Sequence, residues 1–494
     1  MSASSVPLSR REFAAKSALG LLALGATVKA VATAAPDPVA PVASARRGIW
    51  KITRNPKALE TPQDAPPGQT WRYGLNFPFQ VGPTVAGLYC NLKLYEGPGQ
   101  DFEGGTDIVL FEQVGALQTK HTVTVSRPTR VPNPNNGGRP AIMIKYPGLI
   151  GFVSLGAKDA AGRPHPHAGT GFAMVTAAAW PTGPGETPNF TAPDRIGYGA
   201  YTDHRAYRFF ELHQLSYDGV SFTVSPPERI EMDALVGGYR FMSGGFGCAI
   251  ADGDGLLIGL TALRDGAKAA GAGPVRWRRQ GGAWRPVAYE IATPEDNSME
   301  PSFLRDLDGS LLMFSRAPRA MGPPLRVWRQ TAPGRPWELK INVNGLIPSV
   351  PVSLNRTVDG TPYLIANLYE PQFFLPPGLH ADGGVSRLEP VGRRGERTTV
   401  CLWTLNEARD GFDNQIIVRD PLAEFGQPPH GTIWAADHSD GAVVRLGDGQ
   451  WHALVGWRLL EWKENTHFIP PGPRTGSYLD EIHSCGEPVP LWNF

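Results

Sequence analysis

The chain has 494 residues, with 47 Lys plus Arg against 46 Asp plus Glu, and 41% of its residues are hydrophobic. Nucleic-acid-binding proteins present a basic face or stripe, so this nearly neutral balance predicts no DNA or RNA partner. No apolar stretch of membrane length follows residue 34, which favours a globular chain without stable membrane insertion.

The N-terminal segment has the layout of a cleavable export signal. It begins with SRREFAAK at residues 9–16, continues with a weakly apolar run and ends with small residues at 32–34. The pair Arg10 and Arg11 ahead of Phe13 resembles a twin-arginine signal, which an export receptor reads and which does not anchor the protein. We therefore expect residues 1–34 to be a twin-arginine signal peptide, the twin-arginine export machinery to be a partner, and the mature protein to be periplasmic or secreted.

The next segment, residues 35–49, is rich in Pro and Ala and lacks periodicity, so it is predicted to be a linker. The folded domain is expected to cover residues 50–494. Its short runs of β-branched and aromatic residues, separated by Gly, Asp and Pro, are typical of strands and turns. The clearest runs are HTVTVSR (121–127), AIMIKY (141–146), GVSFTVS (219–225) and LLMFSR (311–316).

A repeated unit is visible within this all-β region. An apolar strand, a turn containing D-G and a second apolar strand recur, which is the pattern of a β-hairpin. The turn glycines Gly255, Gly309 and Gly360 are 54 and 51 residues apart, and Trp284 and Trp337 are 53 apart. The units lie at residues 246–266, 300–316, 352–369 and, more loosely, 432–446.

This spacing predicts a six- or seven-bladed β-propeller. A four-stranded sheet with two apolar faces cannot bury both alone, whereas radial stacking of such sheets covers both faces and leaves only short edges. An elongated β-helix is the alternative, but its rungs are much shorter than the observed period.

The four cysteines, Cys90, Cys248, Cys401 and Cys485, are too few and too widely spaced for a disulfide scaffold or a metal site. The sequence leaves two alternatives for these cysteines, which are one or two disulfide bridges or buried free thiols. We expect neither a metal nor a cofactor.

Residues just before the innermost strands of a propeller converge on one mouth of the central channel. Arg240 and Arg356 occupy such positions by the repeat, and Asp203, His204 and Arg205 are candidates further upstream. A polar side chain there can simply cap the backbone. Several arginines together favour a site for a substrate carboxylate, which a guanidinium binds through two parallel hydrogen bonds.

The segment SMEPSFLRDLDGSLLMFSR, residues 298–316, resembles the sialidase superfamily of BNR-repeat propellers. In that family a glutamate precedes a strand, a D-G turn and a second strand closed by an arginine. The resemblance implies that Glu300 assists a tyrosine nucleophile and that Arg316 grips a substrate carboxylate. The Asp-box repeat of the family is present only in the degenerate form QTAPGRPW, residues 330–337.

The resemblance implies a glycoside hydrolase acting on acidic glycans of uronate or sialate type. A substrate carboxylate held by arginines repels a carboxylate nucleophile, so a tyrosine suits the site while a separate acid protonates the leaving oxygen. Tyr478 in RTGSYLDEIHS is the candidate nucleophile, and Asp159 and Asp203 are candidate acids.

Two other functions remain open, because propellers host several of them. A polysaccharide lyase would need a base that removes the proton α to a uronate carboxylate. It would also need a cation that neutralises the negative charge of the developing enolate. His165, His167, His204 and Arg205 could supply them. A non-catalytic glycan-binding propeller would use rim aromatics, for which the candidates are Trp403, Trp434 and Trp457.

Overall fold

The computed structural model describes most of the chain after residue 50. The described residues are 51–59, 70–95, 102–115, 121–127, 129–159, 161–179, 207–231, 235–243, 248–267, 269–296, 298–316, 325–343, 352–368, 395, 397–463, 467–468, 472–484 and 486–489. The predicted signal peptide and linker lie outside these residues, so their boundaries stay predictions.

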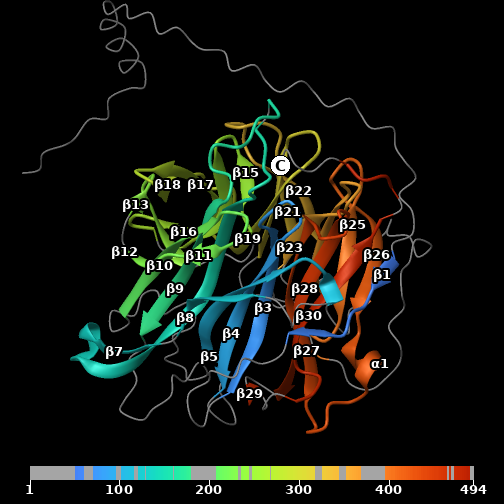
Figure 1. Ribbon diagram of the computed structural model, residues 1–494, viewed down its shortest axis with the longest axis horizontal. Helices are drawn as coiled ribbons and strands as arrows, with labels where there is room; N and C mark the ends of the chain where they lie inside the picture. Colours follow the sequence, from blue (N-terminus) through green and yellow to red (C-terminus); the bar gives the residue numbers. More distant parts are fainter. Residues whose placement is uncertain are drawn as a thin grey trace, which may run out of the picture. The chain divides into compact units, whose positions relative to one another are not determined.

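Six antiparallel sheets form a ring, and each sheet is one blade of a β-propeller. The innermost strand of each blade contacts the next blade, and the last blade contacts the first. In Figure 1 the blue strands of the first blade lie beside the red strands of the last one. The prediction of an all-β propeller is confirmed, and the number of blades is six.

The first two blades carry the longest strands. Blade 1 consists of β3 (Thr70–Gln80), β4 (Ala86–Tyr95), β5 (Phe102–Phe111) and β6 (Thr122–Ser126). Blade 2 consists of β7 (Thr129–Asn133), β8 (Arg139–Val153), β9 (Thr170–Ala179), β10 (Tyr207–Tyr217), β11 (Phe222–Val224) and β12 (Glu228–Glu231), with the 3-10 helix η2 (Pro134–Asn136) before β8.

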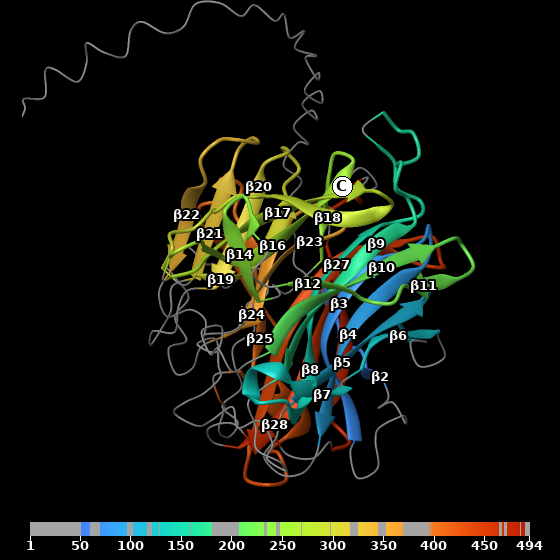
Figure 2. The same cartoon turned by 90° about the vertical axis from the view of Figure 1, so that its left-hand side faces the viewer.

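Blade 3 has an innermost strand that is split in two. Its strands are β13 (Leu235–Val236), β14 (Tyr239–Ser243), β15 (Ile250–Asp252), β16 (Gly255–Arg264), β17 (Gly271–Gln280) and β18 (Ala283–Tyr289). Both β14 and β15 pair with β16, at its two ends. Figure 2 shows β14, β16 and β17 of this blade beside β19–β22 of the next.

Blades 4 and 5 are regular four-stranded meanders. Blade 4 consists of β19 (Met299–Arg305), β20 (Leu311–Arg316), β21 (Leu325–Gln330) and β22 (Glu338–Val343). Blade 5 consists of β23 (Ser353–Arg356), β24 (Pro362–Asn367), β25 (Val400–Leu405) and β26 (Phe412–Arg419), followed by the short helix α1 (Pro421–Phe425).

Blade 6 joins the two ends of the described chain. Its C-terminal strands are β27 (Ile433–Arg445), β28 (Trp451–Lys463), β29 (His467–Phe468) and β30 (Gly476–His483). The N-terminal strands β1 (Lys51–Thr53) and β2 (Lys57–Leu59) both pair with β30. The start of the domain therefore supplies the outer strand of its last blade and closes the ring.

The hydrophobic core lies between the blades. Strands β20, β24 and β25 are buried along their whole length because both faces of each sheet pack against a neighbouring blade. Leu312 and Phe314 of blade 4, for example, share one cluster with Leu354 and Trp403 of blade 5. Each blade thus covers the apolar faces that its neighbours could not bury alone.

Three of the four predicted hairpins have the expected form. The turns at 253–254, 306–310 and 357–361 connect β15 to β16, β19 to β20, and β23 to β24. The fourth prediction is wrong, because residues 433–445 form the single strand β27 and Asp440 and Gly441 lie inside it. A Cβ on Gly441 would come within 2.7 Å of the Tyr363 hydroxyl, so this glycine permits close packing and makes no turn.

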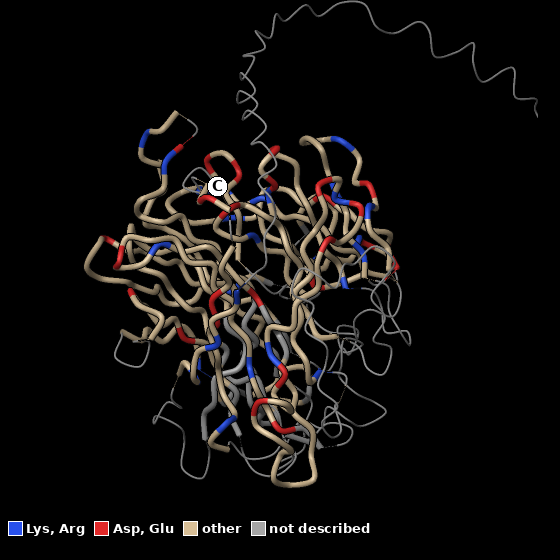
Figure 3. The backbone as a smooth tube through the Cα atoms, turned by 90° about the vertical axis from the view of Figure 1, so that its right-hand side faces the viewer, with Lys and Arg blue, Asp and Glu red and all other residues tan. Residues whose placement is uncertain are grey.

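No disulfide joins any two of the described cysteines, Cys90, Cys248 and Cys401, and Cys485 lies outside the described residues. Within the described part of the chain, no helix is long and apolar enough to cross a membrane. Figure 3 shows Lys and Arg interspersed with Asp and Glu along the described backbone.

Candidate active site

Each blade has two ends. We call the end where its innermost strand begins the start end. We call the opposite end, where a turn connects the innermost strand to the second strand, the turn end. Glu300 lies near the beginning of β19, and Arg316 is the last residue of β20, so both lie at the start end of blade 4. The hairpin therefore returns both residues to the same end, as their spacing predicts.

Glu300 sits at an irregularity in the innermost strand. Met299 pairs with Arg316 and Ser302 pairs with Phe314, so the register shifts between these pairs and Glu300 lies in a β-bulge. Its φ angle is 49°, in the left-handed region that residues with a side chain rarely adopt. Strained residues and bulges occur preferentially at functional sites, where they aim a side chain.

The Glu300 carboxylate and the Arg316 guanidinium form a close ion pair. Nη1 of Arg316 donates to Oε2 of Glu300 at 2.5 Å, and the two side chains are 7% and 1% exposed. The backbone N–H of Glu300 donates to Oγ1 of Thr261 in blade 3 at 3.0 Å. The glutamate is thus held from two blades.

Further charge pairs lie at the same end of blades 3 and 4. Arg326 donates to Asp296 at 2.8 Å, and Asp296 also accepts from the Ser298 hydroxyl at 2.5 Å. Burial opposes ionisation of Asp296, but the hydrogen bonds from Ser298 and Arg326 lower the pKa of its carboxyl. Arg264 pairs with Glu295 in the same region. Both ion pairs lie at the same end of blades 3 and 4 as the Glu300–Arg316 pair.

Arg240 lies at the start end of blade 3, where its Nη2 donates to Oδ1 of Asp265 at 3.2 Å. The structure thus brings Arg240 and Glu300 to the same end of neighbouring blades. Arg356 does not join them, because it is the last residue of β23 and lies next to the turn. Burial lowers the pKa of its guanidinium to about 10, with Asp306 opposing and Arg305 reinforcing the shift. The predicted convergence of the three residues is therefore wrong for Arg356.

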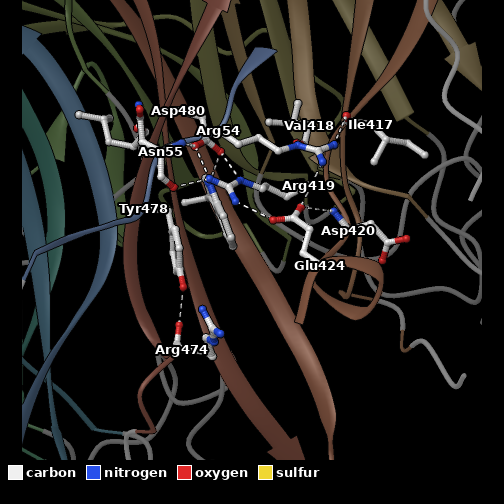
Figure 4. A network of polar contacts seen from close by, with 12 residues as sticks. Arg54, Asn55, Ile417, Val418, Arg419, Asp420, Glu424, Arg474, Tyr478 and Asp480 are labelled. Carbon is white, nitrogen blue, oxygen red and sulfur yellow. Dashed lines mark hydrogen bonds and ion pairs between the residues drawn. The ribbon is translucent and has the colours of Figure 1, made fainter. Parts of the chain in front are cut away.

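Tyr478 lies between blades 5 and 6, on β30, and the structure does not bring it to Glu300. Its ring stacks on Trp457 with centroids 4.3 Å apart, and its hydroxyl donates to the backbone oxygen of Arg474 at 2.6 Å. Burial raises the pKa of Tyr478 to about 12. Figure 4 shows this hydroxyl pointing to Arg474 and away from the charged cluster around Arg419.

The other candidates are distributed between the two ends. Asp203, His204 and Arg205 lie outside the described residues, so their roles stay predictions. His165 and His167 lie in the β8–β9 connection at the turn end, opposite Glu300, as does Asp159, which pairs with Arg163 at 2.7 Å.

Among the described residues, no group of His, Cys, Asp and Glu is arranged to hold a metal ion. The three tryptophans proposed as rim aromatics belong to the core. Trp403 and Trp457 are fully buried, and Trp434 is 3% exposed. This position contradicts a role in stacking against a sugar.

Sequence reasoning missed a buried acid at the centre of the ring. Asp440 lies on β27, the innermost strand of blade 6, and its Oδ1 is 3.3 Å from the side-chain amide of Asn355 on β23. Its Oδ2 has no hydrogen-bond partner among the described residues. Burial raises the pKa of Asp440 to about 6, against the hydrogen bonds from Gly441, Ser353 and Asn355.

The Asp440 carboxyl also affects the ionisation of a thiol in blade 3. Together with burial it raises the pKa of the Cys248 thiol in blade 3, whose Sγ lies 3.4 Å from the backbone oxygen of Pro78 in blade 1. Cys248 also bridges Ile150 of blade 2. Groups from five blades thus meet at this depth. No local pattern marks this acid, and the D-G pair at 440–441 was interpreted as a hairpin turn.

The predicted degenerate Asp box, residues 330–337, leads from the end of β21 into the turn before β22. Gln330, which replaces the usual serine, is buried and donates to the backbone oxygen of Arg335 at 2.8 Å, within the turn between β21 and β22. It also donates to Oε1 of Glu290, which accepts from Trp337 as well. The turn is therefore fixed by a different set of side chains.

No protein-family model matches the chain, and no curated protein sequence matches it. Solved structures do resemble it. A Hadza microbial sialidase is 12% identical, with a TM-score of 0.45, over 84% of this chain and 66% of that chain. A sialidase from Streptococcus pneumoniae is 10% identical, with a TM-score of 0.46, over 88% of this chain and 70% of that one. An α-L-arabinanase from Penicillium chrysogenum is 11% identical, with a TM-score of 0.43, over 89% and 100%.

The chain thus spans about two thirds of the length of these sialidases. Similarity at this level concerns the fold, and the propeller assignment rests on the strand pairing itself.

Proposed function

We propose that the protein is an exported, sialidase-like glycoside hydrolase that acts on acidic glycans, with Glu300 and Arg316 at its active site. The observation that carries the proposal is the buried Glu300–Arg316 pair in a strained bulge at the start end of blade 4. The resemblance of residues 298–316 to the sialidase superfamily supports the same assignment.

The chemistry follows from the charges. An arginine has five N–H donors, and at least one of those of Arg316 bonds Glu300. A guanidinium is the side-chain group that best pairs with a substrate carboxylate. A carboxylate nucleophile would be repelled by that substrate, whereas a neutral hydroxyl is not. Glu300 is suited to accept a proton from such a hydroxyl. Arg240 and the Arg326–Asp296 pair extend the site at the same end.

The proposed catalytic set does not include Tyr478, because its hydroxyl is used in packing between blades 5 and 6. It does not include Arg356, which lies at the turn end. Asp203, His204 and Arg205 stay in the proposal as candidates for the acid and for substrate binding. No described contact favours a lyase, since His165 and His167 lie opposite the site.

The test uses the mature protein and a panel of sialylated and uronate-containing glycans. We expect release of reducing sugar by the wild type and loss of most turnover in Glu300→Gln and Arg316→Lys. Because the pair is buried, both variants are also expected to lose stability, about 3 to 5 kcal/mol at most. Activity is therefore measured per folded molecule, well below the melting temperature of each variant.

The matched control is Arg264→Lys, which alters an exposed ion pair at the same end and should retain activity. Normal turnover of folded Glu300→Gln would contradict the proposed site. Formation of unsaturated uronate, detected by its ultraviolet absorbance, would identify elimination and overturn the hydrolase assignment.

A further inference from the structure

The segment that leads into Glu300 is fixed by the carboxylate of Asp296. Its Oδ1 accepts from the backbone N–H of Ser298 at 3.1 Å and from the Ser298 hydroxyl at 2.5 Å. Its Oδ2 accepts from Nη1 of Arg326 on β21 at 2.8 Å. We call Asp296, Ser298 and Arg326 the Asp296 clamp. The clamp fixes the chain two residues before the residue with the positive φ.

The Asp296 clamp reaches across the end of β20, the strand that carries Arg316. In the sheet of blade 4, β20 lies between β19 and β21. Arg326 pairs with Ser315, the neighbour of Arg316, so its bond to Asp296 ties the entry of β19 to the strand on the other side of β20. Ser298 is fully buried, so the segment before Glu300 is anchored inside the fold.

The chain is also held at and after Glu300. The N–H of Glu300 bonds the Thr261 hydroxyl on β16. A Cβ on Gly259 of the same strand would come within 2.6 Å of the backbone oxygen of Pro301, so β16 lies directly against the chain there. Because both flanks are fixed, the residue between them takes up the mismatch as a φ of 49°.

A second arrangement of the same kind lies at the turn end of blade 4. Oδ1 of Asp308 accepts from the backbone N–H of Ser310 at 2.9 Å, and Oδ2 of Asp308 pairs with Arg329, which is also on β21. The strand that follows, β20, has no residue with positive φ. The turn end therefore offers a carboxylate with matching partners that is not connected to the strained residue.

We propose that Asp296 is a positioning residue of the active site. Through Ser298 and Arg326 it maintains the strained backbone of Glu300 and so keeps the Glu300 carboxylate on Arg316. The role of this carboxylate in catalysis rests on the proposed function, which the inference deepens. Displacement of a reacting group by about 1 Å can cost about 100-fold in rate, so an anchor that prevents relaxation of Glu300 preserves turnover.

The test compares glycine with alanine at position 300 in two backgrounds, because glycine tolerates a positive φ and alanine does not. With Asp296 intact, the unfolding equilibrium constant of Glu300→Gly should be at least about 5-fold smaller than that of Glu300→Ala. With Asp296→Ala added, residue 300 is free to adopt an ordinary strand conformation, and alanine should be favoured by about 2-fold or more. Urea denaturation followed by tryptophan fluorescence measures these constants.

The matched control is Asp308→Ala, which removes the corresponding carboxylate at the turn end. It should leave the preference for glycine at position 300 unchanged. Asp296→Asn is the milder variant, since it keeps an acceptor for Ser298 but loses the ion pair with Arg326, and it should shift the preference toward alanine. If Asp296→Ala does not fold, Asp296→Asn alone decides. A preference for glycine that survives substitution of Asp296 would overturn the proposal.

These measurements use no substrate, so they separate the positioning role from the hydrolase assignment. On an acidic glycan that the wild type cleaves, Asp296→Ala should lower kcat about 10-fold or more with little change in KM, whereas Asp308→Ala should retain turnover. Loss of turnover with an unchanged glycine preference would contradict the positioning role only. A reversed preference without hydrolysis by the wild type would support the hold of Asp296 on residue 300 and contradict the proposed function.

Discussion

Glu300 occupies a backbone conformation that suits glycine better than glutamate. Its φ of 49° places its Cβ close to the following carbonyl oxygen, at a cost of about 1 to 2 kcal/mol. The conformation persists because the Thr261 hydroxyl and the Arg316 guanidinium hold the residue from both sides. A glycine here would relax the backbone but lose the carboxylate.

This strain can be measured by comparing two variants that both remove the ion pair. We expect Glu300→Gly to be more stable than Glu300→Ala by about 1 kcal/mol, because only alanine retains the unfavourable Cβ. Chemical denaturation of both variants gives the difference. At Ser302, two residues later in regular strand, the same pair should rank in the opposite order. Equal stabilities of the two Glu300 variants would show that the backbone is unstrained.

Asp440 predicts an unusual pH dependence of stability. Its folded pKa of about 6 lies above the ordinary 3.8, so the folded state binds its proton more tightly than the unfolded state does. The stabilisation is complete below about pH 4 and is lost as pH rises to about 6, in total about 3 kcal/mol. Melting curves between these pH values should show this fall, and Asp440→Asn should remove it. An unchanged slope in Asp440→Asn would assign the effect to another group.

The site could be predicted from the sequence only where a local pattern fixed the geometry. Glu300 and Arg316 were singled out by the resemblance of residues 298–316 to the sialidase superfamily, and the D-G hairpin placed them at the same end of two paired strands. Arg356 was predicted to lie just before the innermost strand of blade 5, but it is the last of the four residues of β23. A shift of this size moves a residue from one end of a short strand to the other. Asp440 has no local signature, because its environment is made by residues of other blades.

At the scale of elements, a network of charges connects blades 5 and 6. Arg419 at the end of β26 bonds both oxygens of Asp480 on β30, at 2.6 and 2.7 Å, and also Glu424 of α1 (Figure 4). Asp480 accepts further hydrogen bonds from the backbone N–H of Asn55 and from Nε1 of Trp457. Four of these bonds end on the one fully buried carboxylate of Asp480.

We expect Asp480→Ala to lower the free energy of unfolding by about 3 to 5 kcal/mol, because the buried Arg419 would lose its main partner. Urea denaturation followed by tryptophan fluorescence measures the change. Asp410→Ala is the control, since Asp410 is exposed and its hydrogen bonds within the described part of the chain are with Asn406. A change within about 0.5 kcal/mol is expected. Similar midpoints for the two variants would contradict a structural role of the network.

The strands differ in how well their bounds could be predicted from the sequence. β20 was predicted residue for residue because a charged turn and a terminal arginine bound its apolar run. β27 was not, because a bulge between Asp437 and Asp440 lets a D-G pair remain inside a strand. The split innermost strand of blade 3 was not predicted either. Its two short segments, β14 and β15, form one edge of the sheet only because both pair with β16.

At the scale of the whole molecule, the period of the repeat predicted the architecture but not the number of blades. Only the central blades carry a readable D-G hairpin, whereas blades 1, 2 and 6 are built from longer strands with other turns. The pairing of β1 with β30 also has no sequence signal, because it depends on closure of the ring.

Export is the remaining prediction at this scale. Replacing Arg10 and Arg11 by lysine should leave the uncleaved precursor in the cytoplasm, because the export receptor reads the arginine pair. Cell fractionation with an antibody to the propeller measures the distribution. Lys16→Arg is the control and should be exported and processed. Normal export of the double lysine variant would remove the twin-arginine assignment.

The strand that closes the ring also sets the order in which the molecule can fold. Thr53 and His483, whose side chains lie 2.8 Å apart, are 430 residues apart in the chain. The ribosome releases β1 long before β30, so the ring cannot be complete before β30 has been synthesised. Contacts of such long sequence separation form slowly, because the entropy of closing the loop must be lost before the contact compensates for it. An incomplete ring would expose the edge of β30 to other chains. Pairing of this edge with β1, as the ring closes, removes that hazard.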